Sequence, residues 1–480
     1  MNWLRRIVCC GALWVFAAVA HSGAPNILFI VSEDNGPEMG CYGTPIHTPH
    51  LDQLAREGTL FRRAYVPQAG CSQSRAAFLT GLYPHQNGQI GLATWKYAMY
   101  SKKTGNVVTT LKQAGYRTGI IGKLHVNPKE AFQFDFKAIG TSNFSRKDMA
   151  TYMEQARRFM NGSKRPFYLQ VNFPDAHRPF LKQVDGLPAK PLTGTDVEAL
   201  PFMGINHPEL RQQTADYYNC IMRLDTYIGR LLKVLSATGK AKDTVVVYIG
   251  DHGADVMRGK RTSYEGGVRI PMIIRWPGAR AGQRRAELVS TLDLYPTFCE
   301  IAGARIPKAL EGRSLKPILH GQTPEWRRYL FTEFHVHSNH NPWPQRTVCD
   351  ERFKLIHNPV AGDVNPGYDF TMGKKFFVAP EAELLAQAPA QVRAAYALMR
   401  QPPAFELYDL QADPHEFNNL ANDPAYAKTR GRLITELKRW QKETQDPLAD
   451  PAIARRLFEL IQNAGTAERK ALDYKAFMKP

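Results

Sequence analysis

The chain has 480 residues and a formal net charge of +18, and 44% of its residues are hydrophobic and 22% charged. This composition is typical of a folded globular protein, and it excludes a collagen, a coiled coil and a mostly disordered chain. The positive charge favours an anionic partner, although a basic surface also serves solubility. Because the basic residues are scattered and no nucleic-acid-binding motif is present, a polyanionic glycan or a small anion fits better than nucleic acid.

The first residues have the pattern of a secretory signal. Arg5 and Arg6 precede an apolar run over residues 7–20, which ends in the small-residue cleavage pattern A-V-A. A membrane anchor is the alternative, but the run is short for a span of about 20 residues. We therefore expect a signal peptide over residues 1–20 and an exported protein without membrane association, in the periplasm, the medium or a lysosome.

Four apolar runs of strand length follow, with apolar residues on both faces, as in buried parallel strands. They are Asn26–Ser32, Thr118–Ile121, Phe167–Phe173 and Thr244–Ile249. Between them, residues 48–58 have a Thr cap and a Gly stop, and residues 216–235 have apolar residues at helical spacing. The alternation predicts an α/β fold in which helices sandwich a mixed, largely parallel sheet.

The sequence pattern changes after about residue 322. Residues 329–337, 347–357 and 405–410 are predicted strands, and residues 430–444 form a predicted amphipathic helix. We expect a smaller α+β domain over residues 323–480 that closes on a larger domain over residues 24–322. The sequence gives no clear assignment for residues 358–404.

Reactive side chains follow each of the four buried strands directly. In open α/β sheets, ligands bind beyond the carboxyl ends of the strands, so these side chains point to one site at one edge of the sheet. They are Glu33 and Asp34, Lys123 and His125, Asp175 and His177, and Asp251 and His252.

Two of the strand ends are acidic. Glu33, Asp34 and Asp251 together would form an oxygen-rich pocket for a hard divalent ion, calcium or magnesium. The alternative is that each carboxylate caps a helix. His252 is a softer ligand that either binds the ion or orients a neighbour.

The remaining strand-end residues suit an anionic substrate. Lys123 can pair with an anion, and His125 and His177 can transfer protons or donate hydrogen bonds. A lone histidine is more often structural, so this interpretation depends on the position of both histidines at the shared edge of the sheet.

A predicted helix begins at Cys71. Five cysteines follow the signal, an odd number that leaves at least one thiol free. A helix N-terminus lowers the pKa of a thiol and favours anions, so Cys71 is a candidate nucleophile with Arg75 one turn away. A small buried cysteine is the alternative.

The segment CSQSR-AAFLTG resembles the motif C-x-P-S-R followed by A-x-x-x-T-G of the type I sulfatases in the alkaline-phosphatase superfamily. The segments SEDNG, GIIGKLH, PDAHRP, GDHG and GKRTSYEGGVRIP also match, in the order of the family. The resemblance implies an alkaline-phosphatase-like fold, a smaller C-terminal domain with an antiparallel sheet, and hydrolysis of sulfate esters or sulfamates.

The resemblance also implies a cofactor made from the chain itself. A maturation enzyme would oxidise Cys71 to formylglycine, whose hydrate attacks sulfur and displaces an alcohol or an amine. The family's ion is usually one Ca²⁺, rather than Mg²⁺. Its ligands carry over to Glu33, Asp34, residue 71, Asp251 and His252.

The family's remaining site residues also have counterparts here. Arg75 and Lys123 would hold the formylglycine hydrate, and His125 would support it. His177 and Lys260 would bind the sulfate, and a histidine would protonate the leaving group.

Three positions depart from the family pattern. Gln73 stands where the family usually has Pro or Ala, within the signal for cysteine oxidation. Glu33 replaces the commoner Asp and still supplies oxygen, and His252 replaces the commoner Asn.

Within the family, TGLYPHQNGQIGL, RTGIIGKLHVNP and KRWQKETQDP resemble the heparan N-sulfatases, or sulfamidases. This implies a role in glycosaminoglycan degradation, with N-sulfoglucosamine at a non-reducing end as substrate. His335, His337 and Arg346 are candidate sugar contacts from the smaller domain. The alternatives are an O-sulfatase on another sulfated sugar, a phosphodiester or phosphonate hydrolase, and a non-catalytic glycan-binding protein in which Cys71 stays a thiol.

Overall fold

The computed structural model describes residues 23–373, 379–467 and 469–479. The predicted signal peptide lies outside these residues. Among the residues described, no helix combines the length and the apolar character needed to cross a membrane.

A nine-stranded sheet forms the centre of the larger part of the chain, in the order β4-β3-β5-β1-β6-β7-β2-β8 with β9 beside β2. Only β7 runs antiparallel to its neighbours β6 and β2. The strands are β1 (Asn26–Ser32), β2 (Thr59–Tyr65), β3 (Arg117–Ile121), β4 (Phe136–Ala138), β5 (Phe167–Asn172), β6 (Thr244–Gly250), β7 (Arg269–Arg275), β8 (Gln283–Arg285) and β9 (Val289–Ser290). The expected mixed, largely parallel sheet is confirmed.

The four strands expected from sequence lie side by side in the order β3-β5-β1-β6, all parallel. Every residue of β1 and β6 is buried, because helices cover both faces of the sheet. Their carboxyl ends therefore meet at one edge, where side chains from four separate segments come together.

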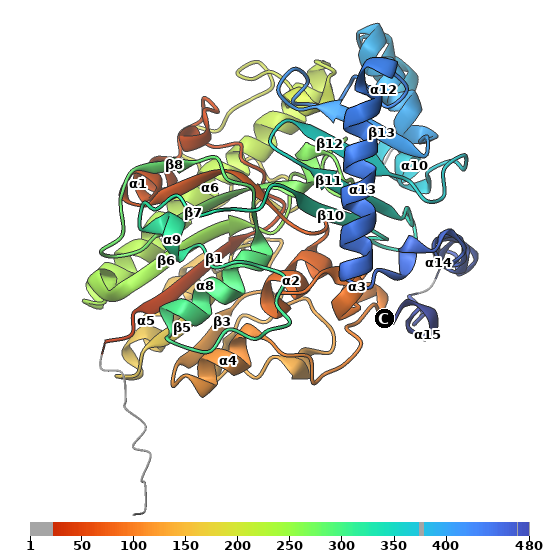
Figure 1. The fold of residues 1–480 in the computed structure, drawn as a ribbon. Helices are drawn as coiled ribbons and strands as arrows, with labels where there is room; N and C mark the ends of the chain where they lie inside the picture. The colour runs from red at the N-terminus through yellow and green to blue at the C-terminus, as the bar shows by residue number, and fades with distance from the viewer. Residues whose placement is uncertain (1–22, 374–378, 468, 480) are drawn as a thin grey trace, which may run out of the picture.

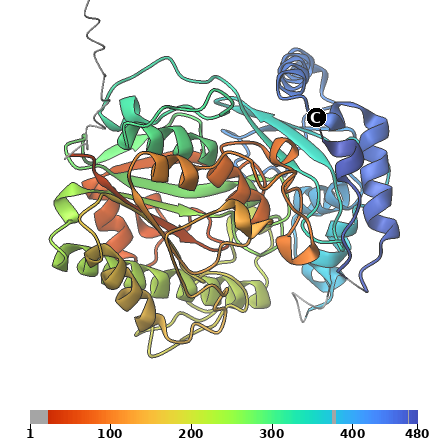
Figure 2. The same cartoon turned by 90° about the horizontal axis from the view of Figure 1, so that it is seen from below.

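Helices form one layer on each face of the sheet, and Figure 2 shows the strands between them. One layer contains α1 (Pro49–Glu57), α5 (Met149–Asn161) and α6 (Pro208–Ala237). The other contains α2 (Cys71–Thr80), α4 (Val107–Gln113) and α8 (Leu294–Ile301). The short helices α3 (Pro84–Asn87), α7 (Glu265–Val268) and α9 (Lys316–Leu319) lie in the connections.

A second, antiparallel sheet has the order β10-β11-β12-β13. Its strands are β10 (Leu330–Phe334), β11 (Gln345–Cys349), β12 (Phe353–His357) and β13 (Phe405–Asp409). The single strand expected over residues 347–357 is wrong, because the chain turns there. The Asp350 carboxylate accepts hydrogen bonds from the backbone N–H groups of Arg352 and Phe353, which stabilises the turn.

Helix α13 (Ala427–Glu443) runs across the small sheet (Figure 1). Its residues Leu433, Leu437 and Trp440 pack against Val348 and Leu355 of the strands. The segment without an assignment from sequence contains α10 (Pro366–Met372), α11 (Glu381–Ala386) and α12 (Ala390–Arg400).

The C-terminal segment returns to the larger part of the chain. Helices α14 (Pro451–Asn463) and α15 (Lys475–Met478) lie near α3 in Figure 1. The Tyr474 hydroxyl accepts a hydrogen bond from Ala98 N at 3.0 Å and lies 2.9 Å from the carbonyl oxygen of Gly88. The hydrogen bonds of Tyr474 therefore hold the loop that follows α3 in place.

We expect Tyr474→Phe to lower the free energy of unfolding by about 1–2 kcal/mol, because it removes the hydroxyl that binds the partly buried N–H of Ala98 and the carbonyl oxygen of Gly88. Urea unfolding followed by circular dichroism measures this change. Tyr426→Phe is the matched control, because the Tyr426 hydroxyl makes no hydrogen bond to any described residue. Equal stability of the two variants would contradict the assigned role of Tyr474.

Candidate active site

Side chains from the ends of β1, β3 and β6 converge at the carboxyl edge of the large sheet. The Lys123 ammonium lies 2.6 Å from Glu33 Oε2. The backbone N–H of Asp34 donates to Asp251 Oδ1 at 2.9 Å. Asp34 has a φ of 48°, in the left-handed region, and this turn lies directly beyond the end of β1. The structure thus places the acidic residues expected from sequence at one point.

Cys71 is the first residue of helix α2 and lies within this group. Every residue of the helix is buried. The Cys71 thiol lies 3.3 Å from His252 Nε2 and 3.9 Å from Asp34 Oδ1. His252 Nδ1 lies 2.9 Å from the carbonyl oxygen of Gly253, so Nε2 is the ring atom turned to the thiol. The candidate nucleophile and the candidate metal ligands therefore share one buried volume.

Arg75 lies one turn further along α2 and is fully buried. Its Nε donates to Asp251 Oδ2 at 3.1 Å, and its Nη1 donates to the carbonyl oxygen of Lys123 at 3.0 Å and to Asn172 Oδ1 at 2.8 Å. The guanidinium group links the ends of β3, β5 and β6, and it fixes the orientation of α2 relative to the sheet.

Lys260 and His177 approach Asp34 from two other segments. Lys260 Nζ lies 2.9 Å and 3.1 Å from the two carboxylate oxygens of Asp34. His177 Nε2 lies 4.0 Å from Asp34 Oδ2, and its ring stacks on Phe144 at 3.9 Å between centroids. The structure therefore brings the metal and catalytic candidates named from sequence into one cluster.

Opposite charges set the protonation states in this group. Burial alone would raise the pKa of Asp34, but the charges of Lys260, His177 and His252 lower it below its usual value. Burial opposes charge on His252, yet the carboxylates of Asp251 and Asp34 raise the pKa of its ring to about 9. Asp34 and His252 are therefore held in their charged forms by neighbours of opposite charge.

His125 has a different environment. Burial, followed by the charges of Lys123 and Arg75, holds the pKa of its imidazole well below the usual range. Both ring nitrogens are buried and have no hydrogen-bond partner among the described residues. Its backbone φ of 56° is in the left-handed region. A neutral imidazole without a partner is suited to bind a ligand that enters the cluster.

The donor atoms fit a hard divalent cation. Two groups have potential ligand atoms within 4.8 Å of one another, and Cys71 is common to both. The first group also contains Glu33, Asp34 and His177, and the second contains Asp251 and His252. Glu33 Oε1 is buried and has no hydrogen-bond partner in the described part of the chain. Carboxylate oxygens with unused lone pairs are the ligands that such an ion prefers.

The sequence did not identify two arginines that support the site. Arg146 Nε and Arg223 Nη2 lie 2.9 Å and 2.7 Å from Asp175 Oδ1, behind the end of β5. They lower the pKa of Asp175 against the effect of burial. Arg223 occupies the buried face of α6, and a charged residue amid apolar helical spacing was the signal that could have revealed it.

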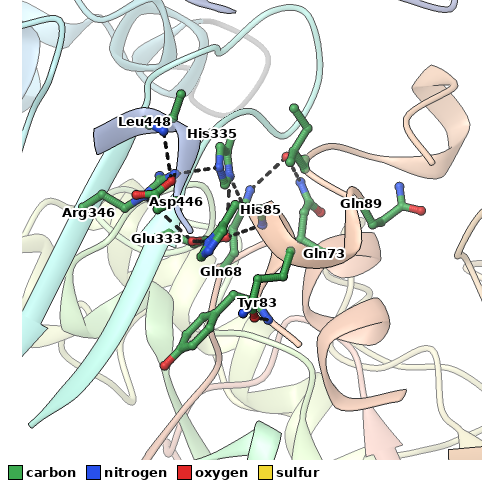
Figure 3. A network of polar contacts seen from close by, with 12 residues as sticks. Gln68, Gln73, Tyr83, His85, Gln89, Glu333, His335, Arg346, Asp446 and Leu448 are labelled. Atoms are coloured by element: carbon green, nitrogen blue, oxygen red, sulfur yellow. Dashed lines mark hydrogen bonds and ion pairs between the residues drawn. The ribbon is translucent and has the colours of Figure 1, made fainter. Parts of the chain in front are cut away.

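The structure contradicts the expectation that His335 and Arg346 contact a sugar. Both are fully buried in a polar network, shown in Figure 3. Arg346 Nη2 lies 2.7 Å from Asp446 Oδ1 and 3.0 Å from His335 Nε2. Glu333 in turn binds His85 Nδ1 at 2.5 Å. The reason is that these side chains lie where the small sheet packs against α3.

His337 remains near the catalytic cluster. Burial, followed by the charges of Lys260 and Arg261, holds the pKa of its imidazole well below the usual range. Its Nε2 is buried without a hydrogen-bond partner among the described residues. Of the three candidates from this part of the chain, His337 is the one whose surroundings suit contact with a ligand.

Gln73 connects the nucleophile helix to the small-sheet part of the chain (Figure 3). Its Nε2 donates to the carbonyl oxygen of Val336 at 2.6 Å, and Gln68 Nε2 donates to the same oxygen at 3.1 Å. Gln68 Oε1 lies 3.1 Å from His335 Nδ1. The residue that departs from the family motif therefore has a structural role at the junction of the two sheets.

Carboxylates, cations and a buried nucleophile candidate lie together at the carboxyl edge of a largely parallel sheet, an arrangement that suits a hydrolase with its ligand beyond the strand ends. The sequence model of the sulfatase family matches residues 25–304, and that of the N-sulphoglucosamine sulphohydrolase C-terminal region matches residues 250–373. The chain belongs to the sulfatase family and is a hydrolase of sulfate esters or sulfamates.

Two curated relatives illustrate the range of the family. The chain is 33% identical over 486 residues to N-sulphoglucosamine sulphohydrolase of Homo sapiens, which covers 91% of this chain and 94% of that protein. It is 30% identical over 449 residues to an ulvan-active sulfatase of Formosa agariphila, which covers 90% of this chain and 83% of the relative. The resemblance inferred from the motifs is confirmed.

Solved structures share the fold at lower identity. A protein solved in complex with its substrate D-glucosamine-2-N,6-O-disulfate has a TM-score of 0.67 and 22% identity, with coverage of 89% of this chain and 99% of that one. A phosphonate monoester hydrolase of Agrobacterium radiobacter has a TM-score of 0.66 and 21% identity, with coverage of 88% and 96%. Sulfatases and phosphonate hydrolases share this fold, so family membership rests on the sequence matches.

We expect Gln73→Ala to lower the free energy of unfolding by about 1–2 kcal/mol, because the variant loses a buried hydrogen bond between the two sheets. Urea unfolding measures the change. The exposed Gln387→Ala is the matched control and is expected to stay within about 0.5 kcal/mol of the parent. An unchanged stability of Gln73→Ala would remove the structural role assigned to this side chain.

Proposed function

We propose that this chain is an exported sulfatase that removes the N-sulfate from N-sulfoglucosamine at the non-reducing end of a sulfated glycan. The observation that carries the proposal is the 33% identity to the human N-sulphoglucosamine sulphohydrolase over 91% of the chain. The match of residues 250–373 to the C-terminal region of that enzyme supports it. We also propose a signal peptide over residues 1–20, a catalytic domain over 24–322 and a smaller domain over 323–480.

The proposed cofactor chemistry has two parts. Residue 71, converted to formylglycine, would supply the oxygen nucleophile, and one bound Ca²⁺ would supply Lewis-acid stabilisation of negative charge. The ion would be held by residue 71 and by Glu33, Asp34, Asp251 and His252. The buried oxygen of Glu33 without a hydrogen-bond partner supports this ligand set.

The other side chains bind and orient. Arg75 and Lys123 flank residue 71, so they would hold its oxygen atoms in position. Lys260 would bind a sulfate oxygen from the side of Asp34. The small exposure of Cys71, 2%, keeps bulk water away from the developing charge and strengthens these interactions.

His177 and His125 are the proposed hydrogen-bond partners for the leaving amine or the sulfate, and His177 in its imidazolium form would protonate the amine. His177 Nδ1 lies 2.6 Å from the carbonyl oxygen of Arg178, which accepts its proton, so Nε2 is the atom presented to the site. His125 has two nitrogens without protein partners in the described residues. The net reaction consumes water and yields a free amine and sulfate.

Sulfate release tests the proposal. The protein is produced together with a formylglycine-generating enzyme, and peptide mass measures conversion of Cys71. We expect release from N-sulfoglucosamine at least tenfold faster than from 6-O-sulfated N-acetylglucosamine, and a loss of about a thousandfold or more in Cys71→Ala.

Other results would select among the alternatives. Release from the O-sulfate alone would identify an O-sulfatase. Faster hydrolysis of a phosphonate monoester than of either sulfate would favour phosphonate chemistry, which the shared fold allows. An intact Cys71 thiol without activity would support a non-catalytic glycan-binding protein.

Removal of metal tests the proposed calcium site. We expect a chelator to abolish activity and lower the melting temperature, because Ca²⁺ at about 100 times its Kd stabilises the folded state by about 3 kcal/mol. Calcium should restore both, and magnesium should not. Glu33→Gln should bind Ca²⁺ at least tenfold more weakly, whereas the exposed control Glu311→Gln should bind it normally. A melting temperature that neither ion changes would contradict the proposed calcium site.

A further inference from the structure

A groove of about 820 Å³ lies between the edge of the large sheet and the small sheet. It is lined by β8 and the residues after it, by the linker at residues 323–328, by the turn between β11 and β12, and by α13. None of the residues of the catalytic cluster lines it. Its volume is that of a ligand-sized pocket, which typically has about 300–1,000 Å³.

The groove is strongly basic. Its lining contains seven arginines and only three acidic residues. The arginines are Arg63, Arg284, Arg285, Arg327, Arg328, Arg352 and Arg432, and the acidic residues are Glu287, Asp350 and Glu351. Low-dielectric walls with one sign of charge focus the field and attract ions of the opposite sign.

Carboxylates neutralise only part of this charge. Ion pairs join Arg285 to Glu287, Arg327 to Asp293, Arg352 to Asp409, and Arg432 to Asp350. Within the described residues, the other three arginines have no carboxylate partner. Arg63 donates to the backbone oxygen of Asp350, Arg284 donates to that of Cys41 at 2.8 Å, and Arg328 lies over the ring of Tyr329. An excess of positive charge thus remains available to a ligand.

We propose that this groove is a second binding site, separate from the catalytic cluster, for a sulfated glycan chain. A guanidinium group presents a planar fork of N–H donors that matches sulfate and carboxylate oxygens, so several arginines along one groove suit a chain that carries both groups. The choice of a glycan rests on the proposed function, whereas the choice of a polyanion rests on the groove alone.

The aromatic residues of the groove argue against single-stranded nucleic acid. Such ligands bind by stacking bases on exposed aromatic faces. Here the guanidinium of Arg327 lies 5.1 Å from the ring centroid of Trp326, and that of Arg352 lies 4.9 Å from the centroid of Phe353. Because arginines lie over both rings, the groove offers charge rather than a stacking platform.

A second site would act on polymers and not on single sugars. A chain held in the groove raises the effective concentration of its own end near the protein. The groove therefore lowers KM for a long sulfated glycan and leaves kcat/KM for the monosaccharide unchanged.

The test uses the mature chain and a sulfated oligosaccharide that the catalytic site cannot take. A heparin octasaccharide made by a lyase is suitable, because its non-reducing end is an unsaturated uronate and not a glucosamine. We expect Arg284→Ala/Arg328→Ala to raise its Kd about tenfold and to flatten the salt dependence of binding. The exposed pair Lys102→Ala/Lys103→Ala removes the same charge elsewhere and should change Kd less than twofold.

Two results would overturn the proposal. One is an equal Kd in both double variants, because binding would then follow net charge alone. The other is a DNA oligonucleotide of equal charge that binds as tightly as the glycan and competes with it. The binding measurement needs no formylglycine and no sulfate release. It therefore distinguishes failure of the catalytic proposal from failure of the proposed second binding site.

Discussion

The compensation of buried charge at the carboxyl edge of the large sheet is the constraint on which the site depends. Glu33, Asp34 and Asp251 are fully buried, and each lies within ion-pair distance of Arg75, Lys123 or Lys260. Unpaired charges at such depth would cost several kcal/mol each. Each buried carboxylate therefore needs a cation beside it in the folded state. These cations come from α2, from the end of β3 and from the loop after β6, and the parallel strand order brings those segments to one point.

The junction between the two sheets extends the same principle away from the site. Glu333, Arg346 and Asp446 are buried beside His85, and charge pairing keeps each of them satisfied (Figure 3). Gln73 joins this junction to the helix that carries Cys71. The small sheet is therefore a structural part of the nucleophile's surroundings, because the orientation of α2 is held from both sides.

The sequence predicted the parts of the fold that local pattern determines. The four buried strands match β1, β3, β5 and β6 to within a residue or so, because continuous apolar runs leave few alternatives. Convergence of the strand ends followed from parallel topology. Arg146 and Arg223 were missed because their partner Asp175 is distant in sequence. His335 and Arg346 were misplaced because only tertiary packing decides that this end of the small sheet is buried against α3.

The burial of Cys71 determines the order of two events, the oxidation of this residue and the folding of the chain. With 2% of its surface exposed, as the first residue of a helix that is buried at every residue, the thiol cannot be reached by another protein once α2 has docked. Any enzyme that oxidises this residue must act on the nascent or unfolded chain. Under the proposed conversion of Cys71, maturation and folding would compete in time, and a molecule that folds first would keep an inert thiol. The fraction of active protein would then be fixed during biosynthesis, before the native state exists.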